Sequence, residues 1–414
     1  MNFIPLPLDA SLAEYEKQAN ELFAALVAGD QEAIAFVRQN HTVLSQLPMH
    51  EFLSASITPA HAQQALTRGY HFENWEQLST WVNEVNRKES ETHAFETAVD
   101  AVVSGDIKLL EAALNKNPEL IHARSSRVHH SMLIHYVGAN GVESYRQRSP
   151  ANAVDVLQLL LRSGAEADAM ADMYGGSSTF GLVATSIWPA KAKVLIPLME
   201  TLLQAGAVID KNDAAGNAQS AVIGCLHNGR PEAAHYLALK GAHLNLEGAA
   251  GVGRLDLVKT FFDSQGALQN GATQKQMEFG FIWACEYGHL PVVEFLLARG
   301  VDPNKNIEEL SGLHWAIIGG HLDIVNFFLS RNISLENKNA YGGTALGCAL
   351  WSVENSDPTY RWPESEDQTL PIIETLLKAG SDIEPGTINW VIEQATIPDH
   401  QKEKLVKMLI EYSN

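Results

Sequence analysis

SAVIGCLHNGRPEAAHYLALKGAHLN (220–245), FGFIWACEYGHLPVVEFLLARGVDPN (279–304) and SGLHWAIIGGHLDIVNFFLSRNISLE (311–336) are three stretches with one shared pattern. Each contains a short apolar segment, a glycine turn, a second apolar segment and a stop at Gly or Asn. The turn glycine precedes the stop by twelve residues in all three, at Gly229–Gly241, Gly288–Gly300 and Gly320–Asn332. A pattern repeated at a period of roughly 33 residues predicts an array of helix–turn–helix units.

The residue types in this pattern have physical reasons. Glycine permits the left-handed backbone of a tight turn and of a helix end, and asparagine is its usual substitute there, as at position 332. In the second helix of the 311–336 unit, apolar residues from Ile324 to Leu329 cover more than one face. A single helix pair cannot bury such a surface, so we expect the pairs to stack against their neighbours.

The repeats resemble the ankyrin repeat family, whose unit contains T-P-L-H-x-A. This motif is matched by Ser311-Gly312-Leu313-His314-Trp315-Ala316 and by Met132-Leu133-Ile134-His135-Tyr136-Val137. The resemblance implies an all-α solenoid of stacked helix–turn–helix units with degenerate terminal repeats. It also implies that His135 and His314 brace the finger backbone. Weaker units are expected at 20–41, 96–117, 132–165, 179–207, 244–266 and 344–381.

Two terminal segments depart from the repeat. Residues 50–90 read as a pair of helices carrying Trp75 and Trp81, and they resemble a segment that precedes the array in a group of bacterial ankyrin proteins. We therefore expect residues 1–90 to form an N-terminal helical capping segment that includes a degenerate repeat. Residues 91–414 are expected to form the repeat array, with a C-terminal helical cap at about 387–414. The only linker expected is the polar stretch at 86–92.

The composition restricts the partner and the compartment. The formal net charge is −20, from 49 acidic and 29 basic residues. Such a field repels nucleic acid and anionic membranes and favours a basic protein partner. Cys225, Cys285 and Cys348 are far apart in apolar stretches, so a reducing, cytoplasmic location is expected. No signal peptide or membrane span is expected, and a monomer is favoured, although the sequence leaves the oligomeric state open.

Three insertions interrupt the repeat between the two helices of a unit. They fall within 141–164, 188–206 and 353–380, measured against the family period. The third insertion is acidic and contains Tyr360 and Trp362, and it is either a lid or a tolerated surface loop.

The ankyrin resemblance places a set of aromatic and polar side chains on the concave groove. Aromatic residues there are typical binding anchors, although packing between repeats is the commoner fate of a large aromatic side chain. The partner-binding residues predicted in this way are Tyr136, Asn140, Trp283, Glu286, Tyr287, Trp315 and Trp351.

A second candidate site is electrostatic. Basic residues gather between His122 and Arg148, where Glu143 is the only acid, and a Gly/Ser-rich turn follows at 175–178. Free N–H groups in such a turn are suited to a phosphate or carboxylate, but an ordinary finger turn is the commoner explanation of so short a motif. The anion-site hypothesis comprises Arg124, Arg127, His129, His130, Arg146, Arg148, Gly175, Gly176, Ser177 and Ser178.

Recognisable catalytic motifs do not occur in the sequence. It has no GxSxG, HExxH, Walker A or dinucleotide fingerprint, and the spacing of His130 and His135 does not suit a metal on a helix. We therefore expect a non-enzymatic scaffold that binds a protein partner, with no cofactor and no metal. The alternative is a small-molecule or anion site, with catalysis left open, built around 142–151 and Gly175–Thr179.

Overall fold

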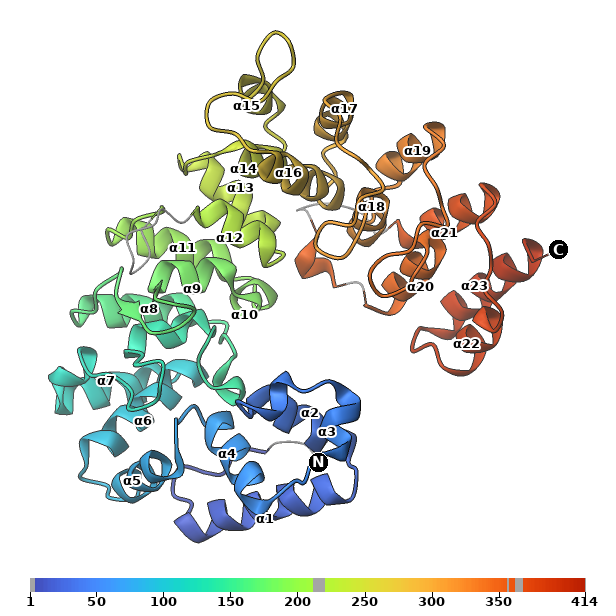
Figure 1. The fold of residues 1–414 in the computed structure, drawn as a ribbon. Helices are drawn as coiled ribbons and strands as arrows, with labels where there is room; N and C mark the ends of the chain where they lie inside the picture. Colours follow the sequence, from blue (N-terminus) through green and yellow to red (C-terminus); the bar gives the residue numbers. More distant parts are fainter. Residues whose placement is uncertain (1–3, 211–219, 356, 362–367, 414) are drawn as a thin grey trace. The chain divides into compact units, whose positions relative to one another are not determined.

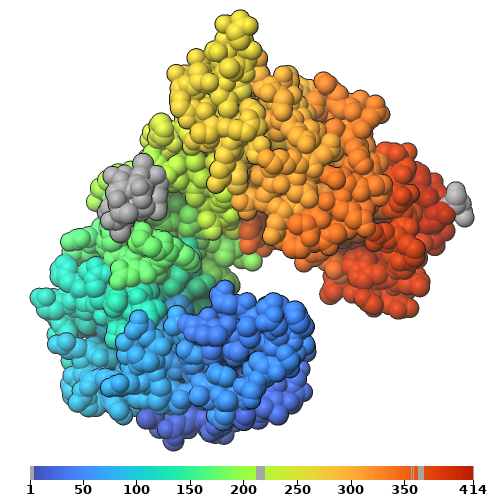
Figure 2. All heavy atoms as spheres, viewed as in Figure 1, coloured from blue at the N-terminus to red at the C-terminus, as the bar shows by residue number. Residues whose placement is uncertain are grey.

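The computed structural model describes residues 4–210, 220–355, 357–361 and 368–413. Helices dominate these residues, and their only named strands are β1 (Met170–Ala171) and β2 (Ser177–Ser178), paired antiparallel. The chain forms two compact units, Met1–Ala218 and Gln219–Asn414, which run from blue to green and from yellow-green to red in Figures 1 and 2. The division thus falls inside the predicted array and not at the linker expected at 86–92. Within the described ranges, no helix has the length and apolarity needed to span a bilayer.

The first unit begins with a set of helices that has its own hydrophobic core. Buried residues from Ala10 to Val85 form one cluster, in which α1 packs on α4 and α2 packs on α4. Tyr145, from the first insertion, also packs against this cluster. The helices of this segment are α1 (Leu12–Val27), α2 (Gln31–Asn40), η1 (Leu44–Gln46), α3 (Met49–Ser54), α4 (Pro59–Gly69) and α5 (Trp75–Val85).

The rest of the first unit is a stack of helix pairs. Helix α6 packs on η3 and η3 packs on α9, while α7, α8 and α11 form a second row. The first helix of the 132–165 unit is a 3-10 helix, η3, which ends where Ala139 adopts a φ of +48°. The helices are α6 (Glu91–Ser104), α7 (Ile107–Lys116), η2 (Pro118–Ile121), η3 (Leu133–Gly138), η4 (Ser144–Arg146), α8 (Ala153–Arg162), α9 (Thr179–Thr185), α10 (Ile187–Lys191) and α11 (Leu195–Gln204).

The second unit has the most regular stack. One row consists of α12, α14, α16, α18 and α20 in contact order, and α15, α17, α19 and α21 form the other. The segment between α15 and α16 projects from this unit (Figures 1 and 2). The helices are α12 (Ala221–His227), α13 (Pro231–Leu239), α14 (Leu246–Gly251), α15 (Leu255–Thr260), α16 (Gln274–Glu286), α17 (Leu290–Ala298), α18 (Gly312–Gly319), α19 (Leu322–Ser330), α20 (Ala345–Asn355), η5 (Pro358–Tyr360), α21 (Thr369–Lys378), α22 (Thr387–Glu393) and α23 (Asp399–Glu411).

The turn and stop positions have the backbone that the sequence predicted. Gly320 ends α18 with a φ of +77°, and Asn332 follows α19 with a φ of +56°. Both values lie in the left-handed region, which glycine occupies without strain and asparagine tolerates better than most residues. The helix–turn–helix reading of the quoted stretches is confirmed.

His135 braces the neighbouring finger hairpin, as the family resemblance implied, while the bond of His314 caps the start of its own helix, α18. His135 Nε2 lies 3.0 Å from the Ala169 carbonyl oxygen, and His314 Nδ1 lies 2.7 Å from Ser311 Oγ. Burial lowers the pKa of His135 to about 4, so this ring is neutral near pH 7. These imidazoles have a structural role.

Candidate binding site

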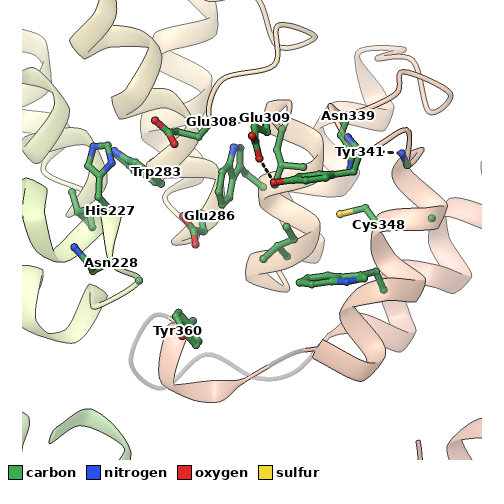
Figure 3. Close-up of a pocket in the computed structure, with 18 residues that line it drawn as sticks. His227, Asn228, Trp283, Glu286, Glu308, Glu309, Asn339, Tyr341, Cys348 and Tyr360 are labelled. Atoms are coloured by element: carbon green, nitrogen blue, oxygen red, sulfur yellow. Dashed lines mark hydrogen bonds between the residues drawn. The ribbon is translucent and has the colours of Figure 1, made fainter. Parts of the chain in front are cut away.

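A groove opens on the inner row of the second unit, among α12, α16, α18 and α20. Its volume is about 930 Å³, and we call it the unit-2 groove. Figure 3 draws the residues around it; in this view Glu286 lies between Trp283 and Tyr360. Four of the seven residues predicted to bind a partner line it, namely Trp283, Glu286, Trp315 and Trp351.

The three tryptophans come from successive inner helices, α16, α18 and α20. The rings of Trp283 and Trp315 meet edge to face, with centroids 5.7 Å apart. Trp283 donates its indole N–H to Glu247 Oε1 at 3.1 Å, and Trp315 donates its indole N–H to the Ile307 carbonyl at 3.1 Å. These bonds hold both rings in place, whereas Trp351 is 52% exposed. The groove therefore combines an ordered aromatic wall with one accessible ring.

Glu286 is a buried carboxylate at the edge of this wall. It is the last residue of α16 and is 8% exposed. Burial raises its pKa to about 8, and a hydrogen bond with Tyr287 opposes that rise. Among the described residues no ion pair joins Glu286 to a cation, and its Oε2 accepts no hydrogen bond. A carboxylate at a helix C-terminus also lacks help from the helix dipole, which favours cations there.

The rim of the unit-2 groove is acidic. Glu308 and Glu309 line it from the hairpin before α18, and Glu309 accepts a hydrogen bond from Tyr341 on the next hairpin. Among the lining residues described, none is a lysine or arginine, and His227 is held by Glu247 with Nε2 and Oε1 3.1 Å apart. The lining thus has an excess of negative charge.

The third insertion contributes to the same groove. Tyr360 stacks under the Arg230 guanidinium, which lies 4.4 Å from the ring centroid, and Arg230 donates to the Thr359 carbonyl at 3.2 Å. The approach at Gly229 is so close that a Cβ there would clash with the Tyr360 ring. This insertion therefore packs against the α12–α13 turn. Trp362, which the sequence analysis placed beside Tyr360, lies outside the described residues.

Three other residues predicted on the groove are placed differently. Tyr287 is buried, and its hydroxyl donates to the Leu226 carbonyl at 2.7 Å. Tyr136 is also buried, with its hydroxyl 3.5 Å from Glu143 Oε1. Asn140 is half-buried and donates its amide to the Leu182 carbonyl. These side chains pack between repeats in this structure, which is the commoner fate of a large aromatic at helical spacing.

The predicted anion site contains a buried ion network instead of a free cationic surface. Arg127 pairs with Glu96 and with Glu143, whose Oε1 lies 2.6 Å from Arg127 Nε. Arg146 pairs with Glu96 Oε2 at 2.5 Å and with Asp100 Oδ1 at 2.7 Å. Burial alone would raise the pKa of Glu96 and Glu143, but the two guanidiniums outweigh it, so both pKa values fall below the ordinary one. These arginines already have anionic partners within the chain.

The remaining members of that cluster are scattered. Arg124 donates to the carbonyls of His130 and Met170, and His130 pairs with Asp172 at 2.8 Å. His129 is buried, while Arg148 is exposed. Residues 175–178 form the turn and second strand of the β1–β2 hairpin, and Ser178 caps α9, a helix of 7 residues. Residues 175–178 therefore form an ordinary finger turn.

Sequence reasoning missed several residues at both places. Glu96 is the acid that joins the two arginines, and its only sequence signal is a charge within the apolar run of α6. At the groove it missed the residues from the hairpins and the insertion, because their proximity depends on the stacking of repeats. These are His227, Glu308, Glu309, Tyr341 and Tyr360.

The described residues offer few groups suited to metal binding or nucleophilic attack. Among the described residues there is no group of three His, Cys, Asp or Glu side chains placed to hold a metal ion. Cys225, Cys285 and Cys348 are buried, and burial raises the pKa of each thiol. Thiols of this kind are poor nucleophiles near neutral pH.

Comparisons with known proteins identify a family for part of the chain. No curated protein sequence matches the chain. Among solved structures, the human ASB11 ankyrin repeat domain is similar, at 14% sequence identity, with coverage of 69% of this chain and 99% of that one and a TM-score of 0.34. The family model for three copies of the ankyrin repeat matches residues 281–386, which include Trp283, Glu286, Trp315 and Trp351. Residues 281–386 therefore match the ankyrin repeat family, in a chain whose described part is a mostly helical array of stacked pairs.

Proposed function

We propose that the chain is a non-enzymatic adaptor that binds a protein partner in the unit-2 groove. Ankyrin repeats generally serve as protein-interaction modules, and the groove lies on the matched repeats. The observation that carries the proposal is the alignment of Trp283, Trp315 and Trp351, one per successive inner helix, along one open groove. Large aromatic rings that are already ordered lose little entropy on binding and are common anchors of interfaces.

The charge of the groove supports a basic partner. Glu308 and Glu309 at its rim are acidic, no lysine or arginine is among the described lining residues, and the net charge of the chain is −20. Such a field steers a basic protein toward the groove and repels nucleic acid. The alternative anion site has weaker support, because Arg127 and Arg146 are already paired with internal carboxylates.

Three further expectations form part of the proposal. Residues 1–90 are a capping segment, which is supported by the separate core from Ala10 to Val85. A reducing, cytoplasmic location is supported by the burial of all three cysteines as thiols without a disulfide. The link between residues 50–90 and bacterial ankyrin proteins stays a prediction.

Site-specific photocrosslinking tests the groove as a docking surface. A benzophenone amino acid replaces Trp351, which is 52% exposed in the groove, and in a control protein it replaces Leu239, which is 72% exposed on α13 outside the groove. We expect a defined covalent adduct from native lysate at position 351 and not at 239. Equal adducts at both positions, or none at 351, would contradict the proposal.

The captured partner is then purified and titrated against matched variants. W351A removes an anchor ring and is expected to weaken binding by about 2 kcal/mol or more, the usual loss at an aromatic hot spot. L239A removes a similarly exposed apolar side chain elsewhere and serves as the control. Because both side chains are exposed, neither change is expected to unfold the unit.

A further inference from the structure

We propose that the unit-2 groove receives an arginine side chain of the partner, with its guanidinium between the tryptophan rings and the Glu286 carboxylate. The inference rests on the function proposed above and names the chemistry that the partner must present. Two independent observations carry it: an internal arginine site built from aromatic rings and carboxylates, and a buried groove carboxylate whose Oε2 has no hydrogen-bond partner among the described residues.

The first observation is the surroundings of Arg127 in the first unit. Its guanidinium carbon lies 4.7 Å from the Trp81 ring centroid and 5.3 Å from that of Phe72. The same group pairs with Glu96 and Glu143. Arg127 is fully buried. This protein therefore already stabilises a desolvated guanidinium with aromatic rings and carboxylates together.

The second observation is that the groove offers groups of the same kinds, and none of its described lining residues is a lysine or arginine. Trp283, Trp315 and Trp351 supply the aromatic faces, and Glu286 supplies the carboxylate. Glu286 is more than nine-tenths buried and lines the groove, yet among the described residues its Oε2 has no hydrogen-bond partner. A buried carboxylate is costly without a counter-charge, so a cation that enters from outside gains both an ion pair and hydrogen bonds.

Arg230, an arginine that contacts the groove residue Tyr360, is engaged elsewhere. It lies over the Tyr360 ring and donates to the Thr359 carbonyl. Glu286 is influenced by burial and by Tyr287, and no arginine contributes to its shift. The position beside Glu286 is therefore open to a guanidinium from another molecule.

Arginine fits this groove better than lysine does. A planar guanidinium stacks on aromatic rings and donates a fork of N–H groups to a carboxylate, whereas a lysine ammonium is a compact and strongly hydrated charge. The volume of about 930 Å³ exceeds what one side chain fills, so neighbouring backbone of the partner also has room. Glu308 and Glu309 at the rim add the negative field that draws a cation inward.

The test uses the full chain and short capped peptides, acetyl-Gly-Ser-X-Ser-Gly-amide, with arginine, lysine, citrulline or norleucine at X. Citrulline keeps the shape of arginine without its charge. The chain is labelled with ¹⁵N-tryptophan, and the indole N–H signals of its 8 tryptophans are followed during titration at millimolar peptide. Signals of Trp283, Trp315 and Trp351 are assigned by single substitution.

Two matched variants locate the effect. E286Q removes the groove carboxylate without changing its size, and E294Q removes an exposed carboxylate on α17 of the same repeat. We expect the arginine peptide to shift the groove tryptophans, with binding about tenfold weaker in E286Q and unchanged in E294Q, because a hydrogen bond to a charged group is lost. Thermal unfolding of each variant verifies that it is folded.

Several results would overturn the inference. These are equal binding of the citrulline or lysine peptide, equal binding of the arginine peptide by E286Q, or no shift of the groove tryptophans. Failure of the wider proposal has a different signature, since the photocrosslink at position 351 would then be missing as well. A crosslinked partner together with a silent arginine peptide refutes the arginine anchor alone.

Discussion

Removal of the Glu96 charge is expected to destabilise the first unit strongly. The change E96Q keeps the shape of the side chain but leaves Arg127 and Arg146 with one fewer carboxylate. Breaking a buried ion pair on one side usually costs about 3–5 kcal/mol, because the remaining charge stays desolvated. Arg127 keeps Glu143 and Arg146 keeps Asp100, so we expect the lower end, about 3 kcal/mol.

Urea and thermal unfolding, followed by circular dichroism, measure this loss. For a unit of this size, about 3 kcal/mol corresponds to a fall in Tm of roughly 6–12 °C. The control is D256N, which breaks the Arg254–Asp256 pair on the surface, where Asp256 is 64% exposed. An exposed pair contributes about 0–1 kcal/mol, so D256N is expected to leave the Tm nearly unchanged.

The pH dependence of stability tests the same network of buried ion pairs. The pKa values of Glu96 and Glu143 are lowered in the folded protein from an ordinary value of 4.5. A carboxyl with a depressed folded pKa contributes stability that is fully present above its unfolded pKa and is lost as the pH falls through the folded value. The wild-type protein should therefore lose stability progressively below pH 4.5, and E96Q should lose less. Equal stability of E96Q and D256N at pH 7 would refute this account.

The remaining predictions concern the second unit. Gly320 has a φ of +77°, so G320A should lower the free energy of unfolding in urea by about 1 kcal/mol or more. Asn332 has a φ of +56°, so N332G should leave that free energy unchanged or raise it slightly. The reverse order would contradict the turn assignment. Burial raises the pKa of Glu286 to about 8, so the folded state holds a proton that the unfolded state releases near 4.5. Wild-type stability should thus fall as the pH rises from 4.5 to 8, and E286Q should lack this fall. Identical pH profiles for the two proteins would exclude the shift.

Other titratable groups near Glu286 also affect the pH profiles of the wild-type protein and of E286Q. Tyr287 follows it in the chain, and the titratable groups that line the same groove come from α12, the hairpin before α18, α20 and the third insertion. Both proteins carry these groups, so the difference between the two profiles isolates Glu286. These groups are His227, Glu308, Glu309, Tyr341, Cys348 and Tyr360.

Local features of the fold were predictable from the sequence because their signals lie within one repeat. The spacing of Gly320 and Asn332 predicted the turn and the helix end, and the Ser311–Ala316 motif predicted the role of His314. The 3-10 form of η3 was not predictable, since its apolar residues from Leu133 to Val137 fit either kind of helix. Pattern specifies that a segment is helical more firmly than it specifies the helix type.

The candidate sites were harder to predict because they depend on contacts distant in sequence. Trp283, Trp315 and Trp351 recur at nearly the family period, so stacking in register brings them to one groove. In contrast, Arg146 and Glu96 are separated by 50 positions, and no local rule pairs them. In the sequence, the cluster of arginines therefore resembles a free cationic surface. In the fold, these arginines are paired with carboxylates from distant positions.

The contact of Tyr360 with Gly229 and Arg230 changes how the second unit can come apart. In a plain stack each repeat touches only its neighbours, so the terminal pairs fray and melt before the middle. Here the insertion that follows α20 packs against the α12–α13 turn, 129 positions away in sequence, so an early repeat contacts a late one. Unfolding of either repeat breaks this contact and destabilises the other repeat. We therefore expect the second unit to unfold cooperatively and not repeat by repeat.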